Sequence, residues 1–328
     1  MSLRLNLALE AGQLELPGDG RVLLLHPPGD LDLSELPLDR LLAVQPFRPD
    51  WEALERKGVA LATEVPGDAR FAATVVFLPR AKDLARALIA RAAGVTDGPV
   101  VVDGAKTDGI ESLLKDLRKR VELGAVLSKA HGKIGWFRAT PAFDDWREVA
   151  GDVDGFRTLP GVFSADGIDP ASALLAAHLP PVLGRHVVDL GAGWGYLSAR
   201  ILQDAAVREL DVVEADRRAL SCAEANVTDP RARFHWADAR SWKAGSAVDT
   251  VVMNPPFHVG RAADPELGRA FIASAARMLT ASGRLFLVAN RQLPYETLLT
   301  EAFAHCEEIG GDGRFKILKA ERPSRRRR

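Results

Sequence analysis

The stretch Val251–His258 constrains the fold of this chain more than any other. Its sequence, Val-Val-Met-Asn-Pro-Pro-Phe-His, begins as a buried strand and reaches two prolines directly after Asn254. Proline has no backbone N–H and biases the residue before it toward extended geometry, so the strand must end at Asn254. A polar amide is thereby held at a strand end beside the flat ring of Phe257. This arrangement suits the binding of a planar amine.

Length and composition limit the classes of protein that need to be considered. The 328 residues are enough for two domains, and 47% are apolar. No apolar run approaches the length of a membrane span, and the N-terminus lacks the segments of a secretory signal. The two cysteines, Cys222 and Cys306, provide neither a disulfide framework nor a metal cluster. We therefore expect a reduced, cytoplasmic protein that uses no metal and no membrane.

The charge is nearly balanced overall but uneven along the chain. The formal net charge is −1, so the surface as a whole is not built to attract polyanions. Basic residues gather in residues 106–138 and again in residues 314–328, which end in the run Arg325–Arg328. Such runs are usually solvated faces, and they also suit local contacts with phosphate groups. The sequence leaves both interpretations open.

Short apolar runs alternate with helical patterns in both halves of the chain. In residues 1–150 we expect strands at 22–25, 59–61, 74–77 and 100–102, and helices at 81–92 and 110–120. In residues 151–328 we expect a helix that opens at Asp169-Pro170, strands at 187–190, 210–214, 233–236, 250–253 and 285–289, a helix at 265–279, and a closing antiparallel pair at 307–309 and 314–318. This alternation predicts mostly parallel α/β sheets with helices on both faces. Residues 144–160 are expected to connect two domains, 1–150 and 151–328.

The two halves resemble each other. Residues 74–79 align with 250–255, residues 98–114 align without a gap with 283–299, and Lys133-Ile134 matches Lys316-Ile317. Shared patterning can produce such similarity, but duplication explains it better. Leu78 stands in place of Asn254, and His26-Pro27-Pro28 stands where the second copy has glycines. The first copy is therefore expected to lack the chemistry of the second.

A glycine-rich turn follows the first strand of the second half, in the run Val-Val-Asp-Leu-Gly-Ala-Gly-Trp-Gly-Tyr of residues 187–196. Glycines let the backbone approach a ligand closely. A nicotinamide dinucleotide site needs Gly-x-Gly-x-x-Gly, whereas here Tyr196 fills the place of the third glycine, which disfavours that cofactor. Glu214 closes the next strand, where an acid can accept both hydroxyls of a ribose. Asp238 closes the third, where it either accepts from an adenine amino group or caps a turn.

In this order the motifs resemble those of class I S-adenosylmethionine-dependent methyltransferases, and the tetrad that starts at Asn254 is similar to that of enzymes methylating exocyclic or amide nitrogens. Further segments resemble the ribosomal RNA guanine-N2 methyltransferases, which pair a degenerate N-terminal methyltransferase-like domain with a catalytic one. These segments are residues 106–110, 161–164, 168–169, 288–290, 293–295 and 313–316. The resemblance covers nearly the whole chain and is strongest from Gly161 onward. Trp194, within the glycine turn, departs from the pattern.

The resemblance implies two tandem Rossmann-like class I methyltransferase domains, each with a mostly parallel sheet of the seven-stranded type and helices on both faces. The N-terminal domain is implied to be degenerate and to bind or orient RNA. The implied cofactor is S-adenosylmethionine, without a metal. The residues implied to bind it are Asp189, Gly191, Gly193, Gly195, Glu214, Asp238 and Asn254.

The implied catalytic residues are Asn254, Pro255, Pro256 and Phe257. The Asn254 side chain and the Pro255 carbonyl would accept the two N–H bonds of a guanine 2-amino group and turn its lone pair toward the sulfonium methyl. Phe257 would stack on the base, and His258 would contact the substrate as a positioning residue.

The implied substrate is ribosomal RNA of the small subunit, either bare or within the ribosomal subunit, and the protein is expected to be a monomer. Two alternatives of the same chemistry remain, methylation of adenine N6 or of a protein glutamine amide, because either nitrogen suits the tetrad. An RNA-binding assembly factor without turnover would keep the fold, although the intact tetrad argues against it.

Overall fold

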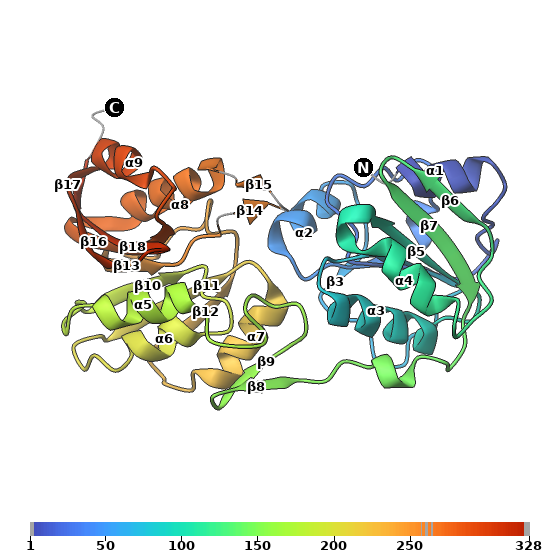
Figure 1. Cartoon of the computed structure of the whole chain (residues 1–328), viewed down its shortest axis with the longest axis horizontal. Helices are drawn as coiled ribbons and strands as arrows, with labels where there is room; N and C mark the ends of the chain where they lie inside the picture. The colour runs from blue at the N-terminus through green and yellow to red at the C-terminus, as the bar shows by residue number, and fades with distance from the viewer. Residues whose placement is uncertain (1–2, 257, 260–261, 264, 325–328) are drawn as a thin grey trace. The chain divides into compact units, whose positions relative to one another are not determined.

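The computed structural model describes residues 3–256, 258–259, 262–263 and 265–324, and the side chains of all of these except residues 258–265. The chain divides into two compact units (Figure 1). Unit 1 contains Met1–Ala150 with Leu159–Gly161, and unit 2 contains Gly151–Thr158 with Val162–Arg328. No helix within the described residues is long and apolar enough to cross a membrane.

Unit 1 is built on a seven-stranded sheet in the order β3-β2-β1-β4-β5-β7-β6. Its strands are β1 (Val22–Leu25), β2 (Leu41–Val44), β3 (Leu61–Ala62), β4 (Ala73–Phe77), β5 (Pro99–Ala105), β6 (Val126–Lys129) and β7 (Gly132–Arg138). The first five are parallel to one another, whereas β7 is antiparallel to both β5 and β6.

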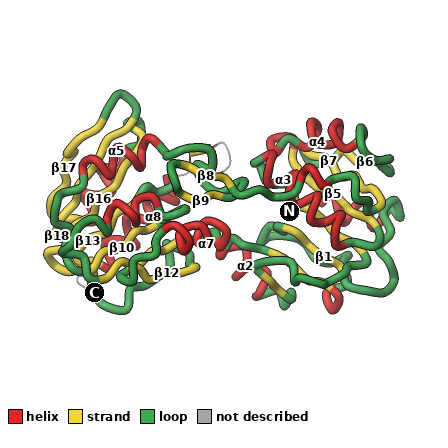
Figure 2. Tube along the Cα trace, turned by 90° about the horizontal axis from the view of Figure 1, so that it is seen from below, coloured by secondary structure: helices red, strands yellow, loops and turns green. Residues whose placement is uncertain are grey.

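Helices cover both faces of this sheet, as strands that are buried at every position require. They are α1 (Leu3–Glu10), α2 (Arg48–Glu55), α3 (Lys82–Val95) and α4 (Ile110–Leu117), and short 3-10 turns lie at Leu38–Arg40, Lys106–Asp108 and Asp144–Trp146. Leu23 and Leu25 of β1 pack in one core with residues of α3 and α4, and Val22 and Leu24 pack in another with residues of α1 and α2. Figures 1 and 2 label these elements.

Unit 2 repeats the same sheet in the order β12-β11-β10-β13-β16-β18-β17. Its strands are β10 (His186–Leu190), β11 (Glu209–Glu214), β12 (Ala232–Trp236), β13 (Val248–Met253), β16 (Leu279–Asn290), β17 (Phe303–Gly311) and β18 (Phe315–Pro323). Two hairpins lie outside this sheet, β8 (Gly151–Val153) with β9 (Phe156–Thr158), and β14 (His258–Val259) with β15 (Ala262–Ala263). Strands β10 to β13 and β16 are parallel, so their carboxyl ends share one edge.

The helices of unit 2 are α5 (Pro170–His178), α6 (Tyr196–Ile201), α7 (Arg217–Asn226), α8 (Pro265–Met278) and α9 (Tyr295–Ala302). In Figure 1, α5 and α6 lie on one side of the sheet and α8 and α9 on the other. Val188 and Leu190 of β10 belong to the core under α8 and α9. Because successive strand residues point to opposite faces, Asp189 points toward α6, where Ser198 donates a hydrogen bond to it.

One ion pair recurs at the same place in both units. Lys133 on β7 pairs with Glu111 in the first turn of α4, and Lys316 on β18 pairs with Glu296 in the first turn of α9. These residues are the ones that the sequence alignment of the two halves matches. Together with the identical strand order, the recurring pair confirms that the two units share one fold.

The structure differs from the sequence-based expectations in several elements. The expected strand at 59–61 is displaced, because β3 covers only Leu61–Ala62, although the Ala60 carbonyl also accepts from the Ala43 N–H of β2. Strand β2 itself was not predicted. Residues 144–160 are not a bare connector, since they contain the hairpin of β8 and β9. The closing pair is longer than expected, since β17 ends at Gly311 and β18 begins at Phe315. In the turn between them, Asp312 Oδ1 accepts from the backbone N–H groups of Arg314 and Phe315.

Candidate active site

The glycine turn leaves β10 at the edge where the parallel strands end. Gly191, Gly193 and Gly195 all have positive φ angles, of 84°, 58° and 92°. A side chain at Gly195 would press on Ala223 of α7 at 3.2 Å, so this glycine allows the turn to pack closely. A Cβ at Gly193 would meet no described atom within 4 Å, so this part of the turn faces open space. The turn therefore leaves room for a ligand beside the end of β10.

Glu214, at the end of β11, is tied to this turn. Its Oε2 accepts from the backbone N–H of Gly193 at 2.8 Å, and its Oε1 accepts from that of Asp216 at 2.8 Å. Burial raises the pKa of the Glu214 carboxyl. Each carboxylate oxygen retains a second lone pair, so these bonds orient the group and leave it able to accept from a ligand.

Asp189 lies beneath the turn and is fully buried. Ser198 Oγ donates to its Oδ2 at 2.6 Å, while Oδ1 has no hydrogen-bond partner among the described residues. Burial raises the pKa of Asp189 to about 7. A buried acceptor without a partner is costly, and a nearby cation would compensate that cost. The site therefore fits a positively charged ligand such as S-adenosylmethionine.

Asn254 follows β13, the strand beside β10, and so lies at the same edge as the glycine turn. Its Nδ2 donates to Asp169 Oδ2 and to Ser172 Oγ, both at 2.8 Å. These two bonds use both N–H groups of the amide and leave Oδ1 as the acceptor of the side chain. Pro255 is buried and Pro256 exposed. Phe257 and the His258 side chain lie outside the described residues.

Asp238 is already engaged in the structure. Its two oxygens form a bidentate pair with the Arg240 guanidinium, with distances of 2.6 to 2.9 Å. Its Oδ1 also accepts from the backbone N–H of Arg240 at 2.9 Å. A carboxylate can accept further bonds, so contact with an adenine amino group stays a prediction.

Aromatic residues surround the glycine turn on its outer side. Trp194 donates its indole N–H to the Phe163 carbonyl at 2.9 Å and packs against Phe156 and Tyr196, with ring centroids 5.2 and 5.9 Å apart. The ring of Phe163 itself is 60% exposed. The tryptophan that departs from the glycine pattern therefore anchors the segment before α5 to the turn.

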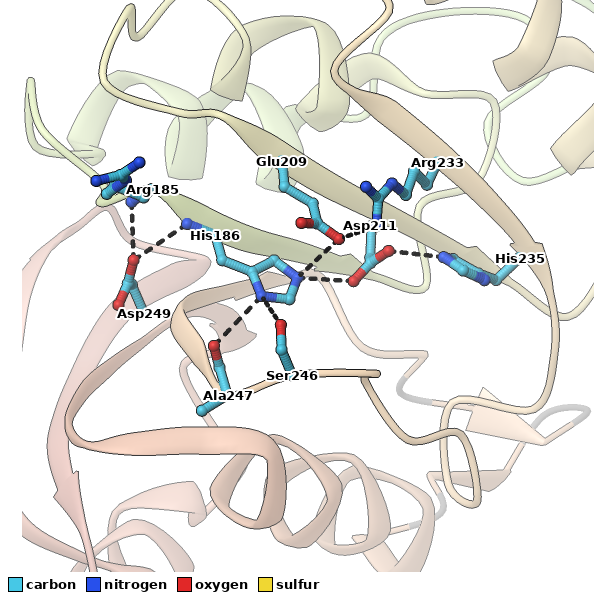
Figure 3. A network of polar contacts seen from close by, with 9 residues as sticks. All are labelled: Arg185, His186, Glu209, Asp211, Arg233, His235, Ser246, Ala247 and Asp249. Carbon is cyan, nitrogen blue, oxygen red and sulfur yellow. Dashed lines mark hydrogen bonds and ion pairs between the residues drawn. The ribbon is translucent and has the colours of Figure 1, made fainter.

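A second polar network crosses β10, β11 and β12 of the same sheet, from His186 at the start of β10 to His235 near the end of β12 (Figure 3). Asp211 accepts from His186 Nε2 at 2.8 Å and from His235 Nε2 at 2.7 Å. His186 Nδ1 is 3.3 Å from the Ala247 carbonyl and 3.2 Å from Ser246 Oγ. One ligand atom each of His186, Glu209 and Asp211 lie within 4.8 Å of one another. The hydrogen bond of His186 with Asp211 and the ion pairs of Glu209 with His186 and Arg233 account for this proximity, so we interpret the network as structural.

The sequence predicted Asn254, the glycines and Glu214 as site residues, and the structure places them at the carboxyl ends of neighbouring strands. Asp169 and Ser172 were missed as partners of the Asn254 amide. The signal for Asp169 was present only as a helix start, because an acid before proline is typical of an N-cap. That cap is observed, with Asp169 Oδ2 accepting from the Ser172 N–H at 2.8 Å. Its second role requires a contact across 85 residues, which no local pattern encodes.

Known proteins resemble this chain over almost its full length. The family model of the methyltransferase small domain matches residues 154–319. The ribosomal RNA small subunit methyltransferase C of Pseudomonas paraeruginosa is 32% identical, over 89% of this chain and 94% of its own. The protein of the same name from Hahella chejuensis is 30% identical, over 95% of this chain and 96% of its own.

A solved structure agrees with these sequences. The T. thermophilus 16S rRNA N2 methyltransferase in complex with AdoMet and guanosine has a TM-score of 0.79 and 27% identity, over 96% of this chain and 91% of its own. The chain therefore belongs to the methyltransferase small domain family and, within it, to the ribosomal RNA small subunit methyltransferases C.

Proposed function

We propose that this protein transfers a methyl group from S-adenosylmethionine to the exocyclic N2 of a guanine in 16S ribosomal RNA. The observation that carries the proposal is the Asn254 amide, fixed at a strand end with its oxygen as the remaining acceptor. The T. thermophilus structure supports the choice of atom, since that enzyme acts on N2 of guanosine 1207. We propose the equivalent guanosine as the target here.

The residues around the glycine turn would hold the methyl donor. S-adenosylmethionine supplies, when bound, an electrophilic methyl group on a positively charged sulfur. The open side of Gly193 would admit the ligand, the Glu214 carboxylate would accept from its ribose hydroxyls, and the buried Asp189 carboxylate would favour its positive charge. We further propose that Asp238, Gly191 and Gly195 complete this site.

The acceptors at the end of β13 would then act on the guanine amine. This amine is a poor nucleophile because its lone pair is delocalised into the ring. Hydrogen bonds from its two N–H groups to Asn254 Oδ1 and the Pro255 carbonyl would favour a more tetrahedral nitrogen with its lone pair toward the methyl group. Such preorganised dipoles and positioning would supply most of the acceleration. As the bond from nitrogen to the methyl carbon forms, the bond from that carbon to sulfur breaks and S-adenosylhomocysteine leaves. The alkylated nitrogen then releases a proton to water, so no charged base is needed.

We propose that Phe257 and His258 contact the substrate. Stacking of Phe257 on the base would add about 1–3 kcal/mol to the binding free energy. Pro256 would hold the loop rigid between them and Asn254. A paired guanine would have to leave its stack to reach the site.

Unit 1 is proposed to bind or orient the RNA. A hollow of about 440 Å³ opens at the carboxyl ends of β4 and β5. Two cations, Arg80 and Lys82, contribute to its lining together with the hydroxyls of Thr107 and Ser112 and one acid, Asp108. This place corresponds in strand order to the Asn254 end of unit 2. Cationic and hydroxyl groups around one hollow suit a phosphate of the RNA backbone. We also propose that the protein is a cytoplasmic monomer.

The test is to incubate the protein and labelled S-adenosylmethionine with small ribosomal subunits, with bare 16S RNA and with total cell protein. Digestion of the labelled RNA to nucleosides should yield N2-methylguanosine. Label on adenine N6 or on a protein glutamine would refute the proposed substrate and support the corresponding alternative.

The Asn254→Ala variant tests the residue itself. By analogy with the loss of one preorganised polar group in other active sites, kcat should fall by about 10²- to 10³-fold while the affinity for the donor stays within about twofold. Gln203→Ala, which truncates an exposed carboxamide after α6, serves as the matched control and should behave as wild type. Retained activity in Asn254→Ala would remove this residue from the mechanism.

A further inference from the structure

The Asn254 amide is held by two groups at the start of α5. Asp169 Oδ2 and Ser172 Oγ each lie 2.8 Å from Asn254 Nδ2. An ionised carboxylate can only accept hydrogen bonds, so the nitrogen of the amide must face Asp169. The shape of the side chain does not distinguish the nitrogen of the amide from its oxygen, but this hydrogen bond does. The oxygen Oδ1 is turned away from Asp169.

The support itself is rigid. Asp169 is the N-cap of α5, and its Oδ2 accepts from the Ser172 N–H at 2.8 Å as well as from Asn254. Pro170 fixes the first turn, and Ser172 is only 7% exposed. The helix packs on β16 and β18 of the same sheet. The carboxylate thus joins the start of α5 to the end of β13 at a fixed position.

We propose that Asp169, assisted by Ser172, is a positioning residue that keeps the oxygen of Asn254 toward the substrate amine. The inference rests on the proposed function, because it assumes that Oδ1 accepts from the reacting nitrogen. An amide rotated by 180° would present its own N–H groups to those of the substrate, which repels it. Without Asp169, both orientations become accessible and only one is productive. Asp169 therefore acts through Asn254 and does not itself touch the reacting atoms.

Asp169→Ser separates this role from the capping of α5. Serine is as good an N-cap as aspartate, so the helix should remain, but its hydroxyl can donate as well as accept and so no longer dictates which end of the Asn254 amide faces it. The expected result is a fall in kcat of about 10- to 100-fold, the range seen when outer partners of active-site ligands are removed. The Kd for S-adenosylmethionine should stay within about twofold, because the Asp169 carboxylate bonds to Ser172 and Asn254 and to no group of the glycine turn among the described residues.

Asp204→Ser is the matched control. Asp204 accepts from the backbone N–H groups of Leu183 and Ala206, before the strands begin, so its loss should lower the melting temperature without a comparable fall in kcat. If kcat falls in proportion to the melting temperature in both variants, Asp169 has only a structural role and the proposal is overturned.

A reciprocal exchange gives the sharper test. Asn254→Asp alone sets two carboxylates against each other and should nearly abolish transfer. Adding Asp169→Asn restores a donor opposite an acceptor, since the introduced amide can donate to the introduced carboxylate and leave its second oxygen for the substrate. The double variant should recover at least about tenfold over Asn254→Asp. No recovery would overturn the proposal.

A readout without substrate keeps this inference distinct from the proposed function. The two side-chain N–H signals of Asn254 in a ¹⁵N NMR spectrum should show hydrogen-bonded shifts in wild type and lose them in Asp169→Ser. If wild type fails to label ribosomal RNA but the signals change as expected, the proposed substrate is wrong and the orientation by Asp169 stands. If RNA is labelled and the signals are unchanged in Asp169→Ser, the function stands and the inference fails.

Discussion

Binding of the methyl donor should depend on pH through Asp189. The folded protein holds the pKa of this carboxyl at about 7, against 3.8 for the free side chain, because the group is buried. At 1.36 kcal/mol per unit, keeping Asp189 ionised in the folded protein costs about 4 kcal/mol. The sign follows from the raised pKa: the penalty is absent below about pH 4, grows as the pH rises, and is complete above about pH 7.

A cationic donor near Asp189 favours the ionised form and should therefore drive its proton off. Below about pH 7 the Kd for S-adenosylmethionine should rise by about tenfold per pH unit, and above pH 7 it should level off. Isothermal titration calorimetry in two buffers with different ionisation enthalpies measures the proton released on binding. We expect close to one proton per donor at about pH 6 and close to none at about pH 8.5.

Two variants distinguish Asp189 from other groups. Glu214 also has a raised pKa, and its charge raises the pKa of Asp189 further. Its titration would therefore add to the pH dependence of donor binding. Asp189→Asn should abolish the proton release, and Ser198→Ala should move the midpoint upward, because the Ser198 hydroxyl lowers the pKa of Asp189. S-adenosylhomocysteine, which lacks the sulfonium charge, should show a weaker dependence. A Kd independent of pH between 5.5 and 8 would refute the reasoning.

Two further predictions follow from other parts of the chain. Although burial opposes it, hydrogen bonds from His186 and His235 lower the pKa of Asp211 to about 2, and the same contact raises the pKa of His186. The network should therefore stabilise unit 2 most between about pH 4 and 6.5, and Asp211→Asn should speed hydrogen exchange in β10 and β11 more at pH 6 than at pH 3. In unit 1, Arg80→Glu with Lys82→Glu should weaken binding of 16S RNA and reduce the salt slope by about 2, whereas donor affinity measured by calorimetry should not change.

Features that depend only on the backbone conformation of their own residues were predicted well from the sequence. The two prolines end β13 at Asn254 because they cannot continue a strand, whatever surrounds them. The glycine turn after β10 follows from positive φ angles that other residues rarely adopt. Both motifs therefore locate one edge of the sheet without knowledge of the rest of the fold.

Features that depend on register were not predictable in the same way. His186, Asp211 and His235 meet because β10, β11 and β12 pair with Val188 opposite Asp211 and Val213 opposite His235. A slip of one residue would turn these side chains to the other face. The contact between Asp169 and Asn254 likewise depends on where α5 packs on the sheet. Sequence patterns identify such residues only for their local roles.

A comparison of the two units separates the residues that the fold needs from those that a ligand site needs. His26 has a positive φ of 54°, directly after β1, where unit 2 has Gly191 with a φ of 84° directly after β10. A residue with a side chain costs about 1–2 kcal/mol in this conformation, yet the backbone path is retained. Leu78, in place of Asn254, is buried, and a Cβ on Gly104 would come within 2.8 Å of it.

An apolar side chain thus fills the position of the amide, while the ion pair of Lys133 with Glu111 matches that of Lys316 with Glu296. The sheet, its turns and this ion pair are stabilised by packing and charge. Both units need these interactions in order to fold. The glycines, the asparagine and its acceptor are needed only where a ligand binds. Unit 1 keeps the fold without those groups, and this independence would allow one copy to serve the proposed recognition of RNA while the other carries out the reaction.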